Sequence, residues 1–144
     1  MAMLGGIFHW GNRIALLLAL ILPCTALASG GGEEENAAPK VAYVSLVPAL
    51  VGNFGAGPKL KFFKADIALR VTGTEAEEKV EHHEPLIRNQ LVMLFAQQTE
   101  AGMADEAAKE KLRQEALKQV QDVLNQEEGK PIVEDLLFNN LIIQ

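Results

Sequence analysis

The sequence predicts a small α+β domain in which two helices cover one antiparallel sheet, with the elements in the order β-β-α-α-β. Side chains alternate between apolar and polar from Phe63 to Val71, as in a strand with one buried face. Two later segments, around Ile87 and around Val120, carry apolar residues three and four positions apart, as half-buried helices do. The chain then finishes in an apolar, β-branched run. Strands and helices in separate runs are typical of an α+β layer.

The first 28 residues precede this domain and have the pattern of a secretory signal peptide. Arg13 comes just before the apolar run Ile14–Leu22, and Ala26-Leu27-Ala28 is a small-x-small exit. We expect cleavage between Ala28 and Ser29. The alternative is an uncleaved membrane anchor, although a spanning helix needs about 20 apolar residues and this run is shorter. Both interpretations place the rest of the chain outside the cytoplasm.

Residues 29–40 form the predicted linker, because three glycines followed by three glutamates favour a flexible, solvated chain. The predicted domain occupies residues 41–144. Cys24 is the only cysteine and lies in the leader, so this domain is expected to fold without a disulfide. The formal net charge is −6 and no lysine or arginine stripe is present, which argues against nucleic acid as a partner.

Two strands are expected first. Val41–Val47 is rich in β-branched and aromatic residues and stops at Pro48, while Phe63–Val71 is the alternating strand. The glycine-rich stretch Gly52–Gly57 is assigned to the turn between them, because Pro58 and a strand follow it and not the helix that a phosphate-binding loop requires. The two strands then most simply form a hairpin.

A helical region is expected from about Glu75 to Gln97. Thr74 and Glu77 match a capping box at its start. Pro85 removes a backbone hydrogen bond, so we expect either one bent helix or a short turn with a second helix beginning at Pro85. The apolar stripe beyond the proline consists of Ile87, Leu91, Leu94 and Phe95.

A long helix is expected to begin at an Asp105 N-cap and to end at Gly129, with Pro131 enforcing the exit. Its charged faces are predicted to be solvated and carry our candidate interaction residues, Arg113 and Lys118. Its apolar stripe consists of Leu112, Ala116, Val120, Val123 and Leu124.

The closing segment predicts a strand with two apolar faces. If it is regularly extended, Leu137, Leu141 and Ile143 form one face, and Leu136, Phe138 and Ile142 form the other. Such a strand is either covered on both faces or offers an edge to a neighbouring chain. We expect most of these side chains, Phe138 included, to lie in the core.

No catalytic, cofactor or metal site is predicted. His82 and His83 are neighbours, and adjacent helical residues point about 100° apart, so they cannot hold one ion as an i, i+4 pair does. Ser45 is the only serine after the linker and lies inside the first predicted strand, so no serine nucleophile arrangement is visible. The sequence therefore predicts a binding or structural module and no enzyme.

Five short motifs, in order, resemble the flagellar basal-body-associated FliL family. Tyr43 and Pro48 followed by Asn53 are similar to its first strand, and Phe63–Leu69 is similar to its second. The remaining residues that carry the resemblance are Pro85, Ile87 and Arg88 in the first helix, Leu112 and Arg113 in the second, and Phe138 with Gln144 in the closing strand.

The resemblance implies a periplasmic, stomatin/SPFH-like domain associated with the inner membrane at the flagellar basal body. It also implies a homo-oligomer that binds the stator proteins MotA and MotB, supports rotation, motility and chemotaxis, and needs no cofactor. The alternative is a periplasmic stomatin-like oligomeric scaffold for a different membrane complex, and a soluble paralogue of the motor protein is also compatible with the short apolar run in the leader.

Overall fold

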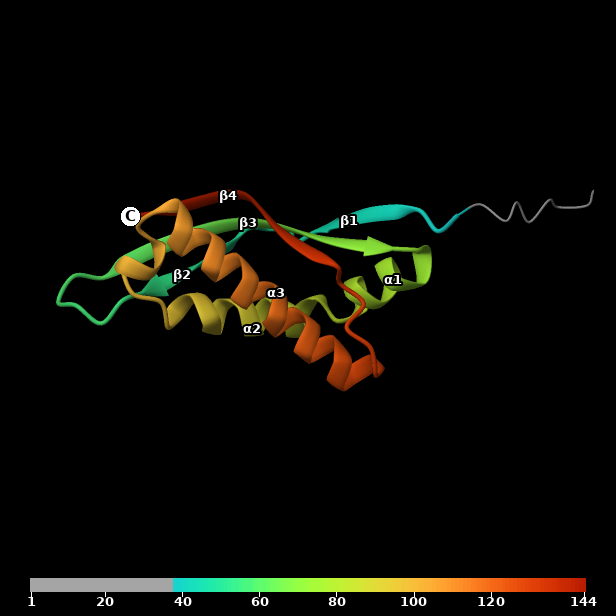
Figure 1. The fold of residues 1–144 in the computed structure, drawn as a ribbon. Coiled ribbons are helices and arrows are strands. Elements are labelled where there is room, and N and C mark those ends of the chain that lie inside the picture. The colour runs from blue at the N-terminus through green and yellow to red at the C-terminus, as the bar shows by residue number, and fades with distance from the viewer. Residues whose placement is uncertain (1–37) are drawn as a thin grey trace, which may run out of the picture. The chain divides into compact units, whose positions relative to one another are not determined.

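The computed structural model describes residues 38–144, in which one layer of helices lies against one sheet (Figure 1). The predicted leader, its cleavage site between Ala28 and Ser29 and most of the predicted linker lie outside these residues. Within residues 38–144, no helix combines the length and the apolar character that crossing a bilayer requires. In chain order the elements are β1 (Val41–Ser45), β2 (Leu50–Phe54), β3 (Lys61–Thr72), α1 (Thr74–His82), α2 (Glu84–Ala96), the 3-10 turn η1 (Ala101–Met103), α3 (Glu106–Glu128) and β4 (Asp135–Ile143).

The predicted α+β class and the small antiparallel sheet are confirmed, with one more strand and one more helix than the sequence predicted. β3 is the central strand. β4 pairs with it from Phe63 to Arg70, while β1 and β2 pair with its two ends. β1 and β2 each pair with residues of β3 that also pair with β4. Because a strand has only two edges, β1 and β2 must share the edge of β3 opposite β4.

The assignment of Gly52 to a turn was wrong, because Leu50–Phe54 is the additional strand β2. Pro48 ends the pairing of β1 with β3, but the chain continues along the same edge of β3 as β2. The Val47–Pro48 peptide bond is cis. The chain resumes pairing at Leu50, opposite Ala65, and Leu50 is buried. The predicted turn is confined to the residues after Phe54.

Gly52 allows β2 to pass close to the core. It lies opposite Phe63, and a Cβ built on it would stand 2.8 Å from two atoms of the Phe63 ring. That ring is buried and stacks on Phe95, with the ring centroids 4.9 Å apart. A glycine here therefore serves packing within a strand and not the geometry of a turn.

A β-bulge corrects the expected faces of β4. Phe138 pairs with Ile67, but the next pair along β3 is Asp66 with Asn140, so Asn139 is an extra residue. One extra residue reverses the side-chain alternation, because the period of a strand is two. The core-side residues of β3 therefore face Leu136, Phe138, Leu141 and Ile143, and the simple alternation predicted for this segment was wrong.

Two helices replace the region expected from Glu75 to Gln97. The break is at His83, and Pro85 lies in the first turn of α2, as the second alternative predicted. The capping box at Thr74 was wrong, because α1 is capped by Gly73 with φ 95° and no side-chain hydrogen bond. A glycine reaches this left-handed conformation without the steric cost of a Cβ.

Both ends of α3 agree with their predicted signals. Asp105 is the N-cap, and its carboxylate accepts a hydrogen bond of 2.8 Å from the backbone N–H of Ala108. Gly129 closes the helix with φ 72°, and its N–H donates to the carbonyl of Asn125.

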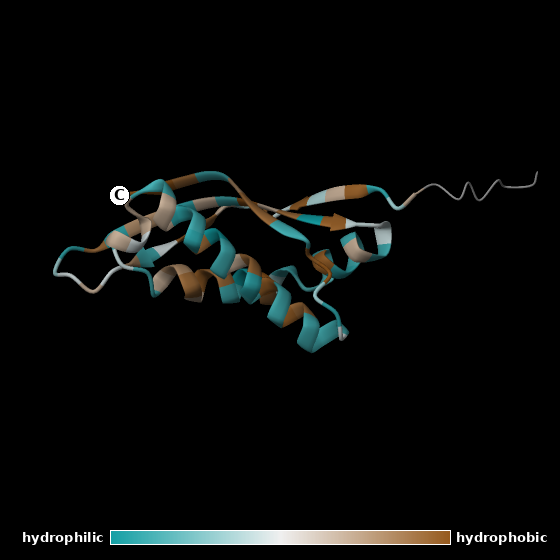
Figure 2. Ribbon diagram, viewed as in Figure 1, coloured by the Kyte–Doolittle hydropathy of each residue, from teal (hydrophilic) through white to brown (hydrophobic). Residues whose placement is uncertain are grey.

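The core lies between the helices and one face of the sheet (Figure 2). The predicted stripe of α3 is buried throughout, as are Ile87, Leu91 and Phe95 of α2, whereas Leu94 is half-buried. No element of residues 38–144 covers the other face of the sheet, where Tyr43 is 56% exposed and Val51 is 63% exposed. One face of the sheet therefore holds the fold together, and the other is available for contacts.

Candidate interaction surfaces

The described residues contain no enclosed polar site. Among residues 38–144, no polar or charged side chain is fully buried, and no group of three histidine, cysteine or acidic residues is placed to hold a metal ion. A catalytic group with a strongly shifted pKa normally needs such burial. The candidates for function are therefore surfaces.

Arg113 ties α3 to β4. Its Nη1 donates to Asp135 Oδ1 at 2.5 Å and to the carbonyl of Leu136 at 3.1 Å. Its Nε and Nη2 donate to the two oxygens of Glu110, at 2.8 and 2.7 Å. Because only 25% of its side chain is exposed, this guanidinium serves the packing of the helix on the strand. The prediction that Arg113 lies on a solvated face of the helix is therefore wrong.

The Arg113 guanidinium also controls the ionisation of Glu110. Hydrogen bonds from Arg113, and then from Gln114, lower the pKa of the Glu110 carboxyl to about 2 from its ordinary 4.5. The same pairing raises the pKa of Arg113 itself. Glu110 and Arg113 therefore both remain charged near neutral pH.

A groove of about 690 Å³ runs between the first turns of α3 and the second half of β4. Its helical wall carries two internal ion pairs, Glu106 with Lys109 and Glu110 with Arg113, so that wall has little net charge. Its other wall is the β4 segment that contains the bulge at Asn139. The residues along the groove are Glu106, Lys109, Glu110, Arg113, Leu137, Phe138, Asn139, Asn140 and Leu141.

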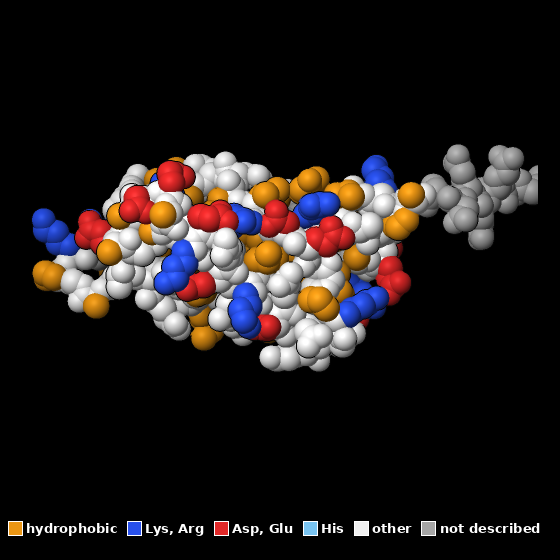
Figure 3. All heavy atoms as spheres, in the orientation of Figure 1, with side chains coloured by type: hydrophobic (Ala, Val, Ile, Leu, Met, Phe, Trp, Pro, Cys, Tyr) orange, Lys and Arg blue, Asp and Glu red, His pale blue; other side chains and the backbone are white. Residues whose placement is uncertain are grey.

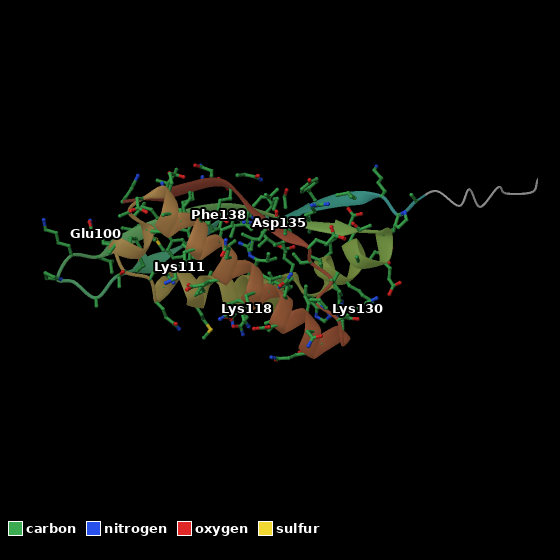
Figure 4. All side chains as sticks on the ribbon, viewed as in Figure 1. Glu100, Lys111, Lys118, Lys130, Asp135 and Phe138 are labelled. Carbon is green, nitrogen blue, oxygen red and sulfur yellow. The ribbon has the colours of Figure 1, made fainter. Side chains whose placement is uncertain are left out.

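Lys118 lies on the exposed side of α3, away from this groove. Its side chain is 74% exposed and pairs with Asp122 one turn later, at 2.6 Å. Figure 4 places Lys118 along the helix and Asp135 on β4, and Figure 3 shows acidic and basic side chains next to one another over this face. Of the two candidate interaction residues, only Lys118 offers its charge to solvent.

A second ionic cluster joins the break between α1 and α2 to the end of α3. His83 Nε2 lies 2.7 Å from Glu128 Oε1, and Lys79 Nζ lies 3.0 Å from the other oxygen of Glu128. The hydrogen bond from His83, followed by the one from Lys79, lowers the pKa of Glu128. His83 thus has a structural partner, which sequence reasoning missed because the two residues are 45 positions apart.

The motif residues divide into buried and exposed groups. Ile87 and Leu112 are buried core residues, Pro85 opens α2, Arg88 pairs with Glu84 at 3.4 Å, and Phe138 packs edge-on against Phe95 with centroids 5.9 Å apart. Tyr43 is exposed on β1, and Pro48 stands between β1 and β2.

Two motif residues, Asn53 and Gln144, lie on either side of β3 at one end of the sheet. Asn53 pairs with Phe62, and the backbone groups of Gln144 exchange hydrogen bonds of 2.8 and 2.9 Å with those of Phe62. Beside this row lies a hollow of about 270 Å³ on the uncovered face, lined by Val51, Phe62, Phe63, Lys64, Ile142 and Gln144. Sequence reasoning missed it because Gly52 and Asn53 of β2 were assigned to a turn.

Comparison with protein-family models gives a match to the flagellar basal body-associated protein FliL over residues 43–144. The chain belongs to the FliL family. The match begins in β1 and includes every later element, so the whole described fold is the FliL domain. No curated protein sequence matches the chain in the corresponding comparison. Membership associates this FliL protein with the flagellar basal body, in an accessory family that is not known as a family of enzymes.

Proposed function

We propose that this FliL protein is a non-enzymatic periplasmic component of the flagellar motor, associated with the inner membrane, that binds the stator proteins MotA and MotB and supports rotation, motility and chemotaxis. The family match over residues 43–144 is the observation that carries the proposal. In this proposal residues 1–28 direct export and are cleaved between Ala28 and Ser29. The proposal also includes the stomatin/SPFH-like fold that the family resemblance implies.

Self-association is the second part of the proposal, and the sheet edges support it. Among the described residues, β1 and β2 pair only with β3, and so does β4, so both edges of the sheet are free of strands. No charged residue occurs from Val41 to Pro58, and none from Leu136 to Gln144. Proteins that remain monomeric usually place charges on such edges to prevent pairing. Copies joined edge to edge would cover both edges, and a head-to-tail contact of this kind can close into a ring.

A deletion strain tests the motor role. Loss of the protein is expected to reduce the swimming halo in soft agar, most strongly at high viscosity, and the full chain supplied in trans should restore it. A strain that swims normally at every viscosity would remove the proposal and favour the alternative, a scaffold for a different membrane complex. N-terminal sequencing of the periplasmic protein would separate cleavage at Ser29 from an uncleaved anchor.

Sedimentation of the purified protein over a range of concentrations tests self-association. Lys118→Glu reverses an exposed charge, so it should leave the melting curve unchanged and weaken the assembly if the exposed face of α3 contacts a neighbour. A monomer at every concentration, with or without a membrane tether, would contradict assembly.

A further inference from the structure

The outer edge of β4 is closed along its first half. Both backbone groups of Leu136 are bonded to side chains: its N–H donates to Asp135 Oδ1 at 2.8 Å, and its carbonyl accepts from Arg113 Nη1 at 3.1 Å. Just before the strand begins, Gln121 Nε2 donates to the carbonyl of Val133 at 2.8 Å. Backbone groups that are bonded in this way are not offered to another strand. Side chains of α3 and β4 therefore cap this part of the edge.

The second half of the β4 edge is open. The backbone groups of Gln144 bond to Phe62 of β3, and along an antiparallel strand every second residue bonds inward like this. Ile143 and Leu141 therefore turn their N–H and carbonyl groups outward. No side chain of residues 38–144 bonds to the backbone of either residue. The bulge at Asn139 separates this open half from the capped half.

β2 has an open edge of the same size on the other side of the sheet. Phe62 bonds to β4, so Phe63 bonds to β2, because successive residues of a strand turn their backbone groups to opposite edges. Gly52, opposite Phe63, therefore bonds inward, and Val51 and Asn53 turn their backbone groups outward. Each open edge thus offers the backbone groups of two residues. Both edges lie at the end of the sheet that the C-terminus marks in Figure 1.

The two open edges are also at the same height along β3. Phe63 pairs with Gly52 on one side and with Ile143 on the other, and the neighbouring pairs follow the same register. A second copy placed beside the first in the same orientation therefore brings its β2 against the open half of β4. Its β1, which pairs with the other end of β3, comes against the capped half. The part of the edge that is free to pair is the part that β2 of a second copy can reach.

We propose that β2 of a second copy pairs in parallel with the open half of β4, with the neighbour's Gly52 opposite Ile143. Ile143 then donates to the carbonyl of the neighbour's Val51 and accepts from the N–H of its Asn53. The Arg113 guanidinium limits the register, because it excludes a strand from the first half of the edge. This inference rests on the self-association in the proposed function and names the contact that makes it. Copies joined in this way keep their helices on the same face of one continuous sheet.

An antiparallel pairing of the same two edges matches poorly. The outward residues of β4, Leu141 and Ile143, carry side chains on the core side, whereas Val51 of β2 points its side chain to the uncovered face. Residues that exchange hydrogen bonds in an antiparallel pair have their side chains on the same face. Such a pairing would therefore put the helices of the two copies on opposite faces of the sheet.

Disulfide cross-linking of the purified full chain tests the pairing. Val51→Cys and Ile142→Cys are placed together in a chain whose only cysteine is removed by Cys24→Ser. Within one copy both positions flank Lys64, so their Cα atoms are two strand spacings, about 9–10 Å, apart, and a disulfide cannot bridge more than about 7 Å. Between copies the two positions face each other. Mild oxidation should therefore give a 51–142 disulfide between copies, which mass spectrometry of the linked peptides identifies.

The matched control lies on the capped half of the edge. Ser45→Cys with Leu137→Cys has the same geometry within one copy, because these two residues flank Ala68 as the first pair flanks Lys64. The control pair should give roughly a tenth of the first yield or less, since the Arg113 guanidinium occupies the place of the neighbouring strand and keeps the Cα atoms beyond the reach of a disulfide.

If the first pair fails to fold, Asn53→Cys with Gln144→Cys replaces it, since these residues flank Phe62 in the same way. A 142–142 disulfide in place of the 51–142 disulfide, or equal yields from the first pair and the control pair, would overturn the inference. Oligomers in sedimentation without a 51–142 disulfide would overturn it and leave the proposed self-association standing. A monomer at every concentration would instead contradict the self-association itself, and this contact with it.

Discussion

Gly52→Ala is expected to destabilise the domain, because the added methyl group has no room. Its Cβ would lie 2.8 Å from the Cε1 and Cζ atoms of Phe63, closer than Cβ contacts in proteins normally come. The Phe63 ring is 1% exposed and stacked on Phe95, so it cannot move aside without disturbing the core. Overpacking of this kind costs about 1–3 kcal/mol. In a domain of this size, that loss lowers the melting temperature by about 4–20 °C.

The matched control is Gly57→Ala, where nothing lies within 4 Å of an added Cβ. Replacing a glycine by alanine also restricts the unfolded chain, which stabilises a protein by about 0.4–1 kcal/mol where the backbone permits it. Gly57→Ala should therefore be neutral or slightly stabilising. Subtracting its effect from that of Gly52→Ala isolates the clash in the folded state.

Urea unfolding followed by far-ultraviolet circular dichroism measures both variants. The midpoint should fall for Gly52→Ala with the slope m unchanged, since a packing defect alters stability and not the surface exposed on unfolding. Phe63→Leu should cost less in the Gly52→Ala background than in the original chain, because the smaller side chain relieves the clash. Equal midpoints for the two alanine variants would refute the close approach of β2 to the core.

Three further predictions concern β4 and α3. Phe138→Asp should cost about 2–4 kcal/mol, because it removes the edge-on contact with Phe95 and places a charge against the core; an unchanged melting curve would contradict the core position of Phe138. Arg113→Gln should cost about 1–2 kcal/mol and return the pKa of Glu110 toward 4.5 in an NMR titration, whereas Lys118→Gln should leave that pKa near 2. The folded-state pKa of Glu110 lies below its ordinary value, so its stabilising contribution is present above pH 4.5 and declines as the pH falls toward 2. Acid unfolding of Glu110→Gln should lack that decline, and identical acid unfolding of the two proteins would argue against the pairing with Arg113.

The local signals that a sequence carries were sufficient for much of this fold. Residues three and four apart on α3 share a face whatever they pack against, so the stripe from Leu112 to Leu124 could be predicted from spacing alone. Asp105 and Gly129 act on backbone groups within four residues, and their roles were equally local. The family resemblance used the same short motifs, and the match over residues 43–144 agrees with it.

Other features were decided only when distant segments met. Asn139 becomes a bulge because β4 must keep Phe138 and Leu141 on the same side of β3, a requirement that local alternation does not contain. Gly52 is part of a strand because its partner, Phe63, lies eleven residues later, and Arg113 is a tie because Asp135 lies 22 residues later. Periodicity and caps are properties of one segment, so the sequence by itself determined them. Strand register, the close packing of Gly52 on Phe63 and the ion pair between Arg113 and Asp135 each need two segments that are distant in the sequence. Only the tertiary structure therefore decided which side chains are buried, which join two elements and which stay exposed.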